Sequence, residues 1–262
     1  MCYDLEYGYE RLIREAKKLK APEQEVSELE EDLERIRKRD QDGPDHYYHL
    51  SGFQHPELGV ILYKNRKLRL EPMTWGLIPH WVENKEQAHK LWNGTLNARS
   101  ETAFEKPSYA AIQSGNKGIL PVESFFEHHH RNKKTFPHRI KNAKGEGLKL
   151  AVVWDEWEDE SGESLKTFAI LTVEGNQKMA EIHNNPKMKG PRMPLMISDE
   201  MAVDWLTQPM NEEDFEKIYS WSAKANHDLE AYPVPSLRGK NAVGNQAAAI
   251  QPYFYQELNT LF

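Results

Sequence analysis

Cysteine is nearly absent from this sequence: the one cysteine among 262 residues is Cys2, directly behind the initiator methionine. A single cysteine excludes an intramolecular disulfide framework and suits a reducing compartment. The sequence also lacks a run of about 18 apolar residues, which excludes a typical transmembrane helix. Its first twenty residues are too charged for a secretory signal peptide. We therefore expect a cytoplasmic protein with no membrane partner.

Metal-binding patterns are missing as well. Neither an HExxH motif nor a CxxC pair occurs in the sequence. The run HHH at 128–130 follows a strand-like stretch, and neighbouring side chains of a strand point to opposite faces, so these three cannot converge on one ion. We expect no metal and no other cofactor.

Positive charge is in deficit: 34 basic and 41 acidic residues give a net charge of -7. Segment 21–45 alone holds ten acidic and four basic residues, so it contributes -6 and leaves -1 for the remainder. Local basic clusters in that remainder can still attract phosphate groups. The charge balance neither requires nor excludes a nucleic-acid partner.

The amino-terminal part has helical periodicity. Apolar residues recur at helical spacing over residues 5–19, Pro22 interrupts the pattern, and a second three-four rhythm follows over 26–36. The second helix has a narrow apolar stripe between charges, which is typical of a surface helix docked along one side. We predict an acidic helical insertion at about 21–45, and DGPD at 42–45 ends its helix.

Strand and helix signals are mixed in the rest of the chain. Runs of β-branched and aromatic residues predict strands at 58–63, 148–154 and 166–173. Helical signals occur near 176–183, 199–207 and 211–219, and the last begins with an asparagine cap and an acidic first turn. Because no regular βαβ rhythm appears, we predict an α+β fold in one domain over 2–262.

Four short segments combine polar residues with apolar or turn-like surroundings: MTWGLIPHW (73–81), LNARSET (96–102), ILPVESFFEHHH (119–130) and EIHNNPKMKGPRMPLMI (181–197). Each has a structural explanation when taken alone. Asn97 could be a turn residue, Glu127 could face solvent, and His183 could cap a helix. Cys2 could likewise be a small buried apolar residue.

Taken together, the initial MC and these segments in this order resemble the SOS-response-associated peptidase (SRAP) family, whose members process abasic sites in DNA. The resemblance also covers LAVVWDEWEDESGESLKTFAILTVEGN and the closing IQPYFYQEL. It implies a mixed, mostly antiparallel sheet or barrel-like core with flanking helices. It further implies a partner, single-stranded DNA containing abasic sites, in the DNA damage (SOS) response. On DNA, such a cytoplasmic protein would be nucleoid-associated, and we expect a monomer.

The resemblance also implies residue roles. Met1 would be removed, and Cys2 would then attack the aldehyde of the abasic site. Asn97 would position this nucleophile, while Glu127 and His183 would act as acid–base groups. The residues expected to contact DNA are Arg99 and Arg192 for phosphates, Trp75 for a base, and Lys187 and Lys189 as further cations.

These residue types suit the chemistry. A free α-amine has a pKa of about 7.7–8.0, so an unprotonated fraction exists near neutral pH. The amine of Cys2 can form an imine with the aldehyde, and its thiol can close a five-membered thiazolidine intramolecularly. A carboxylate such as Glu127, preceded by two phenylalanines, would have a raised pKa if buried, which suits proton delivery.

The sequence departs from the family pattern directly after Cys2. Tyr3 and Asp4 stand where many members have glycine and arginine, which removes one expected phosphate contact. Either the affinity for DNA would be weaker, or lysines at 133, 134, 187 and 189 would compensate. The stretch between His183 and RMP is longer than usual, and His128 replaces a commoner tryptophan.

Two other functions fit the residues. Cys2 with His183 and Asn97 could form an N-terminal-nucleophile amidohydrolase or cysteine peptidase. The protein could also be a non-catalytic module that binds single-stranded nucleic acid, with an incidental cysteine.

Overall fold

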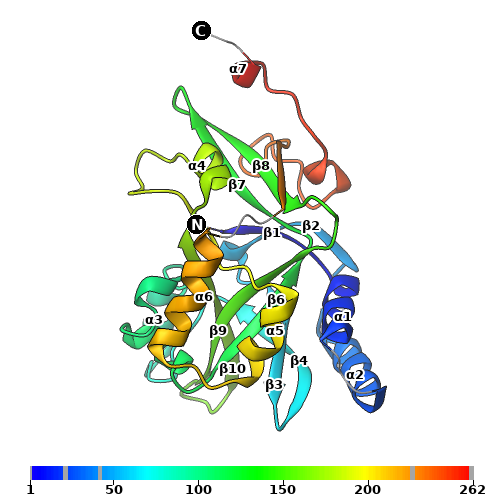
Figure 1. The fold of residues 1–262 in the computed structure, drawn as a ribbon, viewed down its shortest axis with the longest axis vertical. Helices are drawn as coiled ribbons and strands as arrows, with labels where there is room; N and C mark the ends of the chain where they lie inside the picture. The colour runs from blue at the N-terminus through cyan, green and yellow to red at the C-terminus, as the bar shows by residue number, and fades with distance from the viewer. Residues whose placement is uncertain (1, 20–22, 41–42, 225–227, 260–262) are drawn as a thin grey trace.

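The computed structural model describes residues 2–19, 23–40, 43–224 and 228–259, and two sheets dominate it (Figure 1). The first sheet has the strand order β12-β8-β7-β1-β2. Its strands are β1 (Asp4–Gly8), β2 (His46–Ser51), β7 (Ser124–Arg131), β8 (Lys134–Asn142) and β12 (Leu229–Pro233). Every pairing within this sheet is antiparallel.

The second sheet closes into a barrel. Its order is β11-β10-β4-β3-β6-β9, and β9 also pairs with β10, so β10, β4, β3, β6 and β9 form a ring. Two pairings are parallel, those of β10 with β4 and with β5. The strands are β3 (Glu57–Lys64), β4 (Lys67–Trp75), β5 (Asn97–Arg99), β6 (Lys117–Val122), β9 (Leu148–Glu158), β10 (Ser164–Glu174) and β11 (Arg192–Pro194).

Helices flank the two sheets (Figure 1). They are α1 (Tyr9–Lys18), α2 (Glu23–Arg39), α3 (Lys85–Trp92), α4 (Gln177–Ile182), α5 (Asp199–Thr207), α6 (Glu212–Lys224) and α7 (Gln256–Asn259), with short 3-10 turns at Gly52–Gln54, Ser100–Thr102, Pro107–Ile112 and Ala247–Ile250. The predicted α+β class and the mostly antiparallel, barrel-like core are confirmed. Within the described ranges, no helix is both long and apolar enough to cross a bilayer.

The prediction of a helix over 5–19 is wrong in its first part. Residues 4–8 form strand β1, and α1 begins only at Tyr9. Leu5 and Tyr7 are fully buried at strand spacing, while Asp4 and Glu6 alternate with them. Pairing with β2 and β7 on both sides outweighs the helical spacing.

Helix α2 docks along one stripe, as its pattern predicted. Leu29 and Ile36 are buried in the main core, and Leu33 packs partly against it. Asp32 on the same helix is almost fully buried and accepts two hydrogen bonds, of 2.7 and 2.6 Å, from Arg69 of β4. The acidic helix is therefore fixed to the barrel by an apolar seam and a bidentate ion pair. The first residue of the DGPD segment, at position 42, lies outside the described residues.

Candidate active site

The single cysteine lies two residues before the interior strand β1, which begins at Asp4. Cys2 is fully buried, and its backbone carbonyl accepts a hydrogen bond of 2.8 Å from Nδ2 of Asn97. Asn97 is in turn held by β5, which pairs with β10 in register Asn97 to Ile170. Burial raises the pKa of the Cys2 thiol well above its usual value, and the nearby charge of Glu127 raises it further. An asparagine and a carboxylate from two different sheets thus meet at the cysteine.

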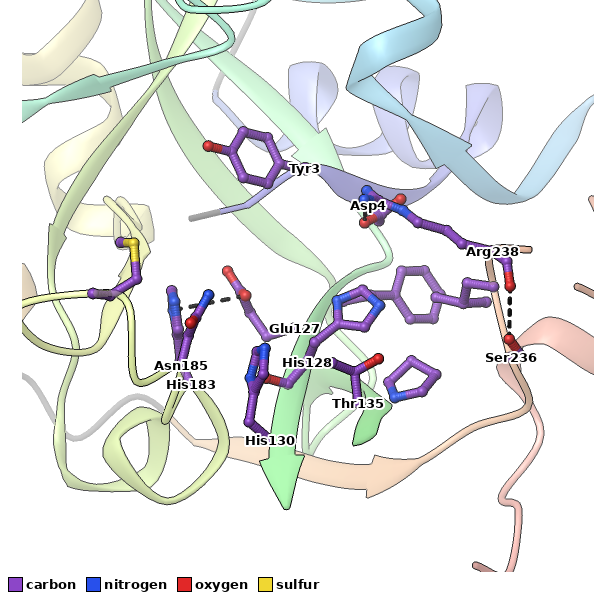
Figure 2. A pocket seen from close by; sticks show the side chains of 14 residues that line it. Tyr3, Asp4, Glu127, His128, His130, Thr135, His183, Asn185, Ser236 and Arg238 are labelled. Atoms are coloured by element: carbon purple, nitrogen blue, oxygen red, sulfur yellow. Dashed lines mark hydrogen bonds and ion pairs between the residues drawn. The ribbon is translucent and has the colours of Figure 1, made fainter. Parts of the chain in front are cut away.

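Glu127 and His183 form a buried pair beside this cysteine. Oε2 of Glu127 lies 3.6 Å from Nδ1 of His183, and each side chain is about 5% exposed (Figure 2). Asp4 of β1 pairs with Phe126 of β7, so the chain that precedes Asp4 runs beside Glu127. Burial raises the pKa of Glu127 to about 7. A carboxyl group with this pKa can both give and take a proton near neutral pH.

Burial changes the titration of His183. An unperturbed imidazole titrates near pH 6.5, but burial lowers the pKa of His183 to about 4. Its Nδ1 lies 3.0 Å from the carbonyl oxygen and 3.3 Å from the amide nitrogen of Arg192. At neutral pH His183 is therefore an uncharged imidazole, suited to orient Glu127 or relay its proton.

A pocket of about 460 Å³ opens over this pair (Figure 2). Tyr3, the neighbour of Cys2, lines it, whereas Cys2 itself does not. The other polar or charged lining residues include Asp4, His128, His130, Thr135, Asn185, Ser236 and Arg238, together with Glu127 and His183. The pocket therefore leads to the Glu127–His183 pair and to the residue next to the cysteine.

The four cations predicted to contact DNA differ in solvent exposure. Arg99, Lys187 and Lys189 are exposed, and Lys187 lines a second hollow of about 610 Å³ with Arg131 and Lys133. His130 and Asn185 line both hollows, so the two adjoin. This arrangement gives the pocket a basic flank on the side of the β7–β8 turn.

Arg192 is engaged within the protein. Its guanidinium makes hydrogen bonds of 2.5 and 2.9 Å to the carboxylate of Glu101 and one of 2.6 Å to the carbonyl of Thr172. Its side chain is 11% exposed. A phosphate contact by Arg192 would therefore compete with Glu101.

Removing the Glu101 carboxylate should release Arg192 toward DNA. Each phosphate contact adds about 0.7 to the slope of log affinity against log salt for single-stranded DNA. We expect Glu101→Gln to steepen this slope by roughly that amount, measured by fluorescence anisotropy. Glu105→Gln, at an exposed position of the same loop region, is the matched control, and parallel slopes for the two variants would mean that Arg192 has a structural role.

Trp75 cannot support a base in this structure. It is fully buried, its Nε1 donates a hydrogen bond of 2.8 Å to the Leu96 carbonyl, and its ring stacks with Phe168. The prediction for Trp75 is therefore wrong, because the ring is part of the core beneath the β2–β3 connection. The exposed aromatic residue at that connection is Phe53, which lies 45% exposed.

Sequence reasoning also missed the residues around Asp4. The Asp4 carboxylate, nearly fully buried, is 2.9 Å from Nε2 of His49 and accepts a hydrogen bond of 2.6 Å from Arg238. Burial alone would raise the pKa of Asp4, but the contacts with His49 and Arg238 lower it overall. Arg238 lies 234 positions away in the sequence, and no local pattern links the two.

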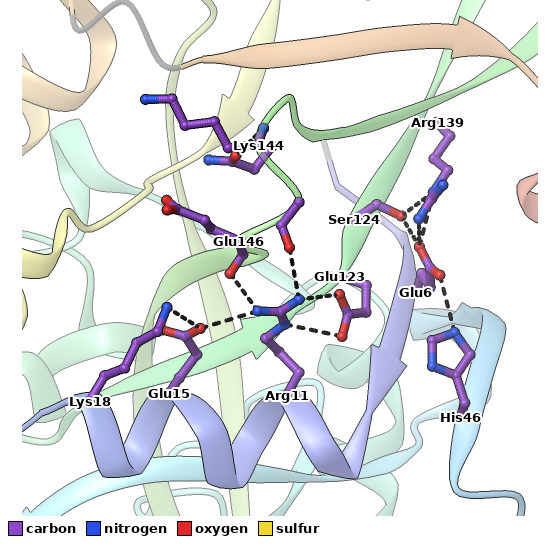
Figure 3. Close-up of polar contacts among 12 residues, drawn as sticks. Glu6, Arg11, Glu15, Lys18, His46, Glu123, Ser124, Arg139, Lys144 and Glu146 are labelled. Atoms are coloured by element: carbon purple, nitrogen blue, oxygen red, sulfur yellow. Dashed lines mark hydrogen bonds and ion pairs between the residues drawn. The ribbon is translucent and has the colours of Figure 1, made fainter.

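A buried ionic network anchors β1, the strand that follows Cys2 (Figure 3). The Glu6 carboxylate, 2% exposed, accepts hydrogen bonds from Ser124 (2.5 Å) and from Arg139 (2.9 and 2.5 Å), and it lies 3.1 Å from His46. These partners belong to β7, β8 and β2. The network therefore fixes β1 laterally within its sheet.

Arg139→Leu should destabilise the protein strongly. It would leave the buried Glu6 carboxylate without its cation, and breaking a buried ion pair in this way costs about 3–5 kcal/mol. Lys141 lies on the same strand as Arg139 and forms a more exposed ion pair with Glu230 of β12. Lys141→Leu should therefore cost less than about 1 kcal/mol. Urea unfolding measures both free energies, and equal losses would contradict an anchoring role for the network.

Among the residues described, no group of three or more histidine, cysteine, aspartate or glutamate side chains could hold a metal ion.

The sequence of this chain is similar to those of one known protein family. The profile of the SOS response associated peptidase (SRAP) family matches residues 18–241. "Abasic site processing protein YoqW" of Bacillus subtilis is 32% identical over 201 residues, which cover 76% of this chain and 84% of that protein. "Abasic site processing protein YedK" of Escherichia coli is 26% identical over 199 residues, covering 75% and 82%.

A crystal structure of a protein from Bacteroides thetaiotaomicron has the same fold, with a TM-score of 0.78 and 24% identity over 97% of this chain and all of that one. The profile match and the shared fold thus define an SRAP-type protein. The chain belongs to the SOS response associated peptidase family.

Proposed function

We propose that this protein processes abasic sites in single-stranded DNA by forming a covalent thiazolidine link through Cys2 after removal of Met1. The observation that carries the proposal is the convergence of Asn97 and Glu127 on Cys2, with His183 3.6 Å from Glu127, beside one open pocket. The names of the curated relatives agree with abasic DNA as the substrate class.

The reaction consumes one aldehyde and one aminothiol. Opening of the abasic sugar hemiacetal gives the aldehyde, and the α-amine of mature Cys2 adds to its carbon. Loss of water gives an imine, and the thiol then adds to the same carbon while the imine nitrogen takes up a proton. The products are a thiazolidine and one water molecule, with no redox change. The second addition is intramolecular and gains from a high effective molarity.

Proton transfers fall to Glu127. In its protonated form it can donate to the ring oxygen as the sugar opens and to the hydroxyl that leaves as water, and its carboxylate can accept the proton of the attacking amine. His183, uncharged at neutral pH, orients this group or relays its proton. The hydrogen bond from Asn97 fixes the Cys2 backbone without adding a charge.

Exposed cations would bind the DNA, and one of them, Lys187, lines the hollow that adjoins the pocket. Arg99, Lys187 and Lys189 supply sequence-independent attraction for phosphates, and Arg192 joins them when Glu101 is displaced. Selectivity for the lesion then comes from the aldehyde, which an intact nucleotide lacks. A stable covalent link would protect the abasic site during the response to DNA damage.

A direct test uses purified full-length protein and a single-stranded oligonucleotide with one abasic site. Intact-mass spectrometry should show loss of one methionine, and a denaturing gel should show a slower, covalently linked band. An active protein that retains Met1 would contradict the aminothiol mechanism. Turnover of a small amide without the linked band would favour an amidohydrolase, and binding without a link would favour a non-catalytic module.

A further inference from the structure

An aromatic pair lies at the rim of the pocket, next to the cysteine. The rings of Tyr3 and Phe53 are 5.0 Å apart with an interplanar angle of 34°. Tyr3 is half-buried and lines the pocket, whereas Phe53 is 45% exposed. Arg238, also lining the pocket, holds its guanidinium carbon 5.4 Å from the centre of the Phe53 ring. We call Tyr3, Phe53 and Arg238 the rim triad.

The backbone beneath Phe53 is held in place. The amide of Gly52 donates a hydrogen bond of 2.8 Å to the Tyr3 carbonyl. A Cβ at Gly52 would lie 3.1 Å from the Trp75 ring, so the turn rests directly on this buried tryptophan. His55, at the end of the turn, lies 2.8 Å from the Trp75 carbonyl. The buried Trp75 thus supports the turn that presents Phe53 to solvent.

Arg238 is also preorganised. One of its terminal nitrogens bonds the buried Asp4 carboxylate at 2.6 Å, and its loop is closed by a hydrogen bond of 2.9 Å from the Ser236 hydroxyl to the Arg238 carbonyl. Its side chain remains 46% exposed. A guanidinium has five N–H donors in a planar fork, so the fork can bind a phosphate while it keeps its contact with Asp4.

We propose that the rim triad binds the nucleotide adjacent to the abasic site, with its base stacked on the Tyr3–Phe53 pair and its phosphate on Arg238. The proposal rests on the proposed function, since it names how the same pocket positions its DNA. An abasic nucleotide offers no base for recognition, so an aromatic platform must use a neighbour. Aromatic rings accept any base because every base has a flat π-face.

The position of the triad favours this occupant. Tyr3 is bonded directly to Cys2, so a base stacked on it lies about one nucleotide from the reacting amine. The triad also lines or borders the pocket that contains Glu127 and His183. The Arg238 guanidinium carbon is 5.4 Å from the centre of the Phe53 ring, so a base on the rings and its phosphate on the guanidinium can be bound together. These two contacts would position the DNA strand without recognising its sequence.

The test measures non-covalent affinity in a Cys2→Ala background, by fluorescence anisotropy, so that it does not depend on crosslinking. The probe is a single-stranded oligonucleotide with one tetrahydrofuran abasic analogue. Phe53→Ala should weaken binding about 5- to 100-fold, while Phe53→Trp should retain it. Tyr63→Ala, which removes another exposed aromatic residue at the far end of β3, should leave affinity unchanged.

A second oligonucleotide makes the test specific. It carries tetrahydrofuran at the abasic position and at both neighbours, so no adjacent base is present. Parental protein and Phe53→Ala should bind this probe equally. An equal loss on both probes, or no loss on the first, would overturn the inference. If Phe53→Ala loses affinity as expected but the protein with Cys2 forms no crosslink, the proposed chemistry fails while the platform stands.

Discussion

Cys2→Ala should abolish the DNA crosslink that survives denaturation, and it should do so completely. Both atoms that join the sugar carbon in the proposed thiazolidine belong to this residue, and the chain has no second cysteine to replace the thiol. The residue is also the one contacted by Asn97 and influenced by Glu127. No other side chain at the pocket combines an amine and a thiol on adjacent carbons.

The variant allows the two halves of the mechanism to be separated. Alanine and serine at position 2 are small enough for methionine removal and keep the α-amine, so an imine should still form. Borohydride should trap this imine as a linked band for Cys2→Ala and Cys2→Ser, whereas without reductant the band should be absent. A reductant-free crosslink of normal yield from either variant would show that the thiol is not used.

Glu127→Gln should slow crosslink formation by about 10²- to 10⁴-fold, the range for loss of a general acid–base group. Glutamine keeps the shape and the buried polar contacts but holds no transferable proton. Non-covalent affinity for the abasic oligonucleotide should change little, because Glu127 is buried and contributes no cation. Single-turnover rates at saturating protein separate these effects.

The pH dependence gives a second readout. In the proposed mechanism the wild-type rate needs protonated Glu127, whose pKa is about 7, and an unprotonated α-amine, whose pKa is about 7.7–8.0. The rate is proportional to the product of these two fractions, so its pH profile should be bell-shaped with a maximum between about pH 7 and 8. Glu127→Gln should lose the decline on the alkaline side. A variant with the wild-type rate and the same bell would remove Glu127 from the mechanism.

The same pKa has a consequence for stability. Burial raises the folded-state pKa of Glu127 from its usual 4.5 to about 7, so the folded protein holds this proton more tightly than the unfolded chain. The stability associated with the protonated form is complete below about pH 4.5 and is lost as pH rises through 7. Relative to Glu127→Gln, the wild type should lose up to about 3 kcal/mol between these limits.

The sequence pattern predicted those helices and strands whose conformation follows from their own residues. The strands β3, β9 and β10 and the helices α2, α4, α5 and α6 follow repeats that can be read from the sequence. Strand β1 could not be predicted because Leu5 is compatible with both helical and strand spacing. Its partners begin about 40 and 120 residues later, so long-range pairing decided its conformation.

The sequence predicted which residues form the candidate site but not how they are arranged in space. Cys2, Asn97, Glu127 and His183 came from the family resemblance, and their burial in one place reflects the β1–β7 register and the β5–β10 pairing. The ion pair of Arg192 with Glu101 and the burial of Trp75 were invisible in the sequence, since both depend on neighbours distant along the chain. Phe53, a single aromatic residue in a turn, carries no periodic signal.

Strand β1 is the first in the chain, yet it lies inside its sheet between β2 and β7. Its partner Phe126 follows Asp4 by about 120 residues, which a ribosome takes roughly 6–24 s to add at about 5–20 residues per second. During that interval one edge of the nascent strand has no partner to pair with. If Met1 is removed as we propose, the open edge gives that processing a period of several seconds before the second side of β1 is closed.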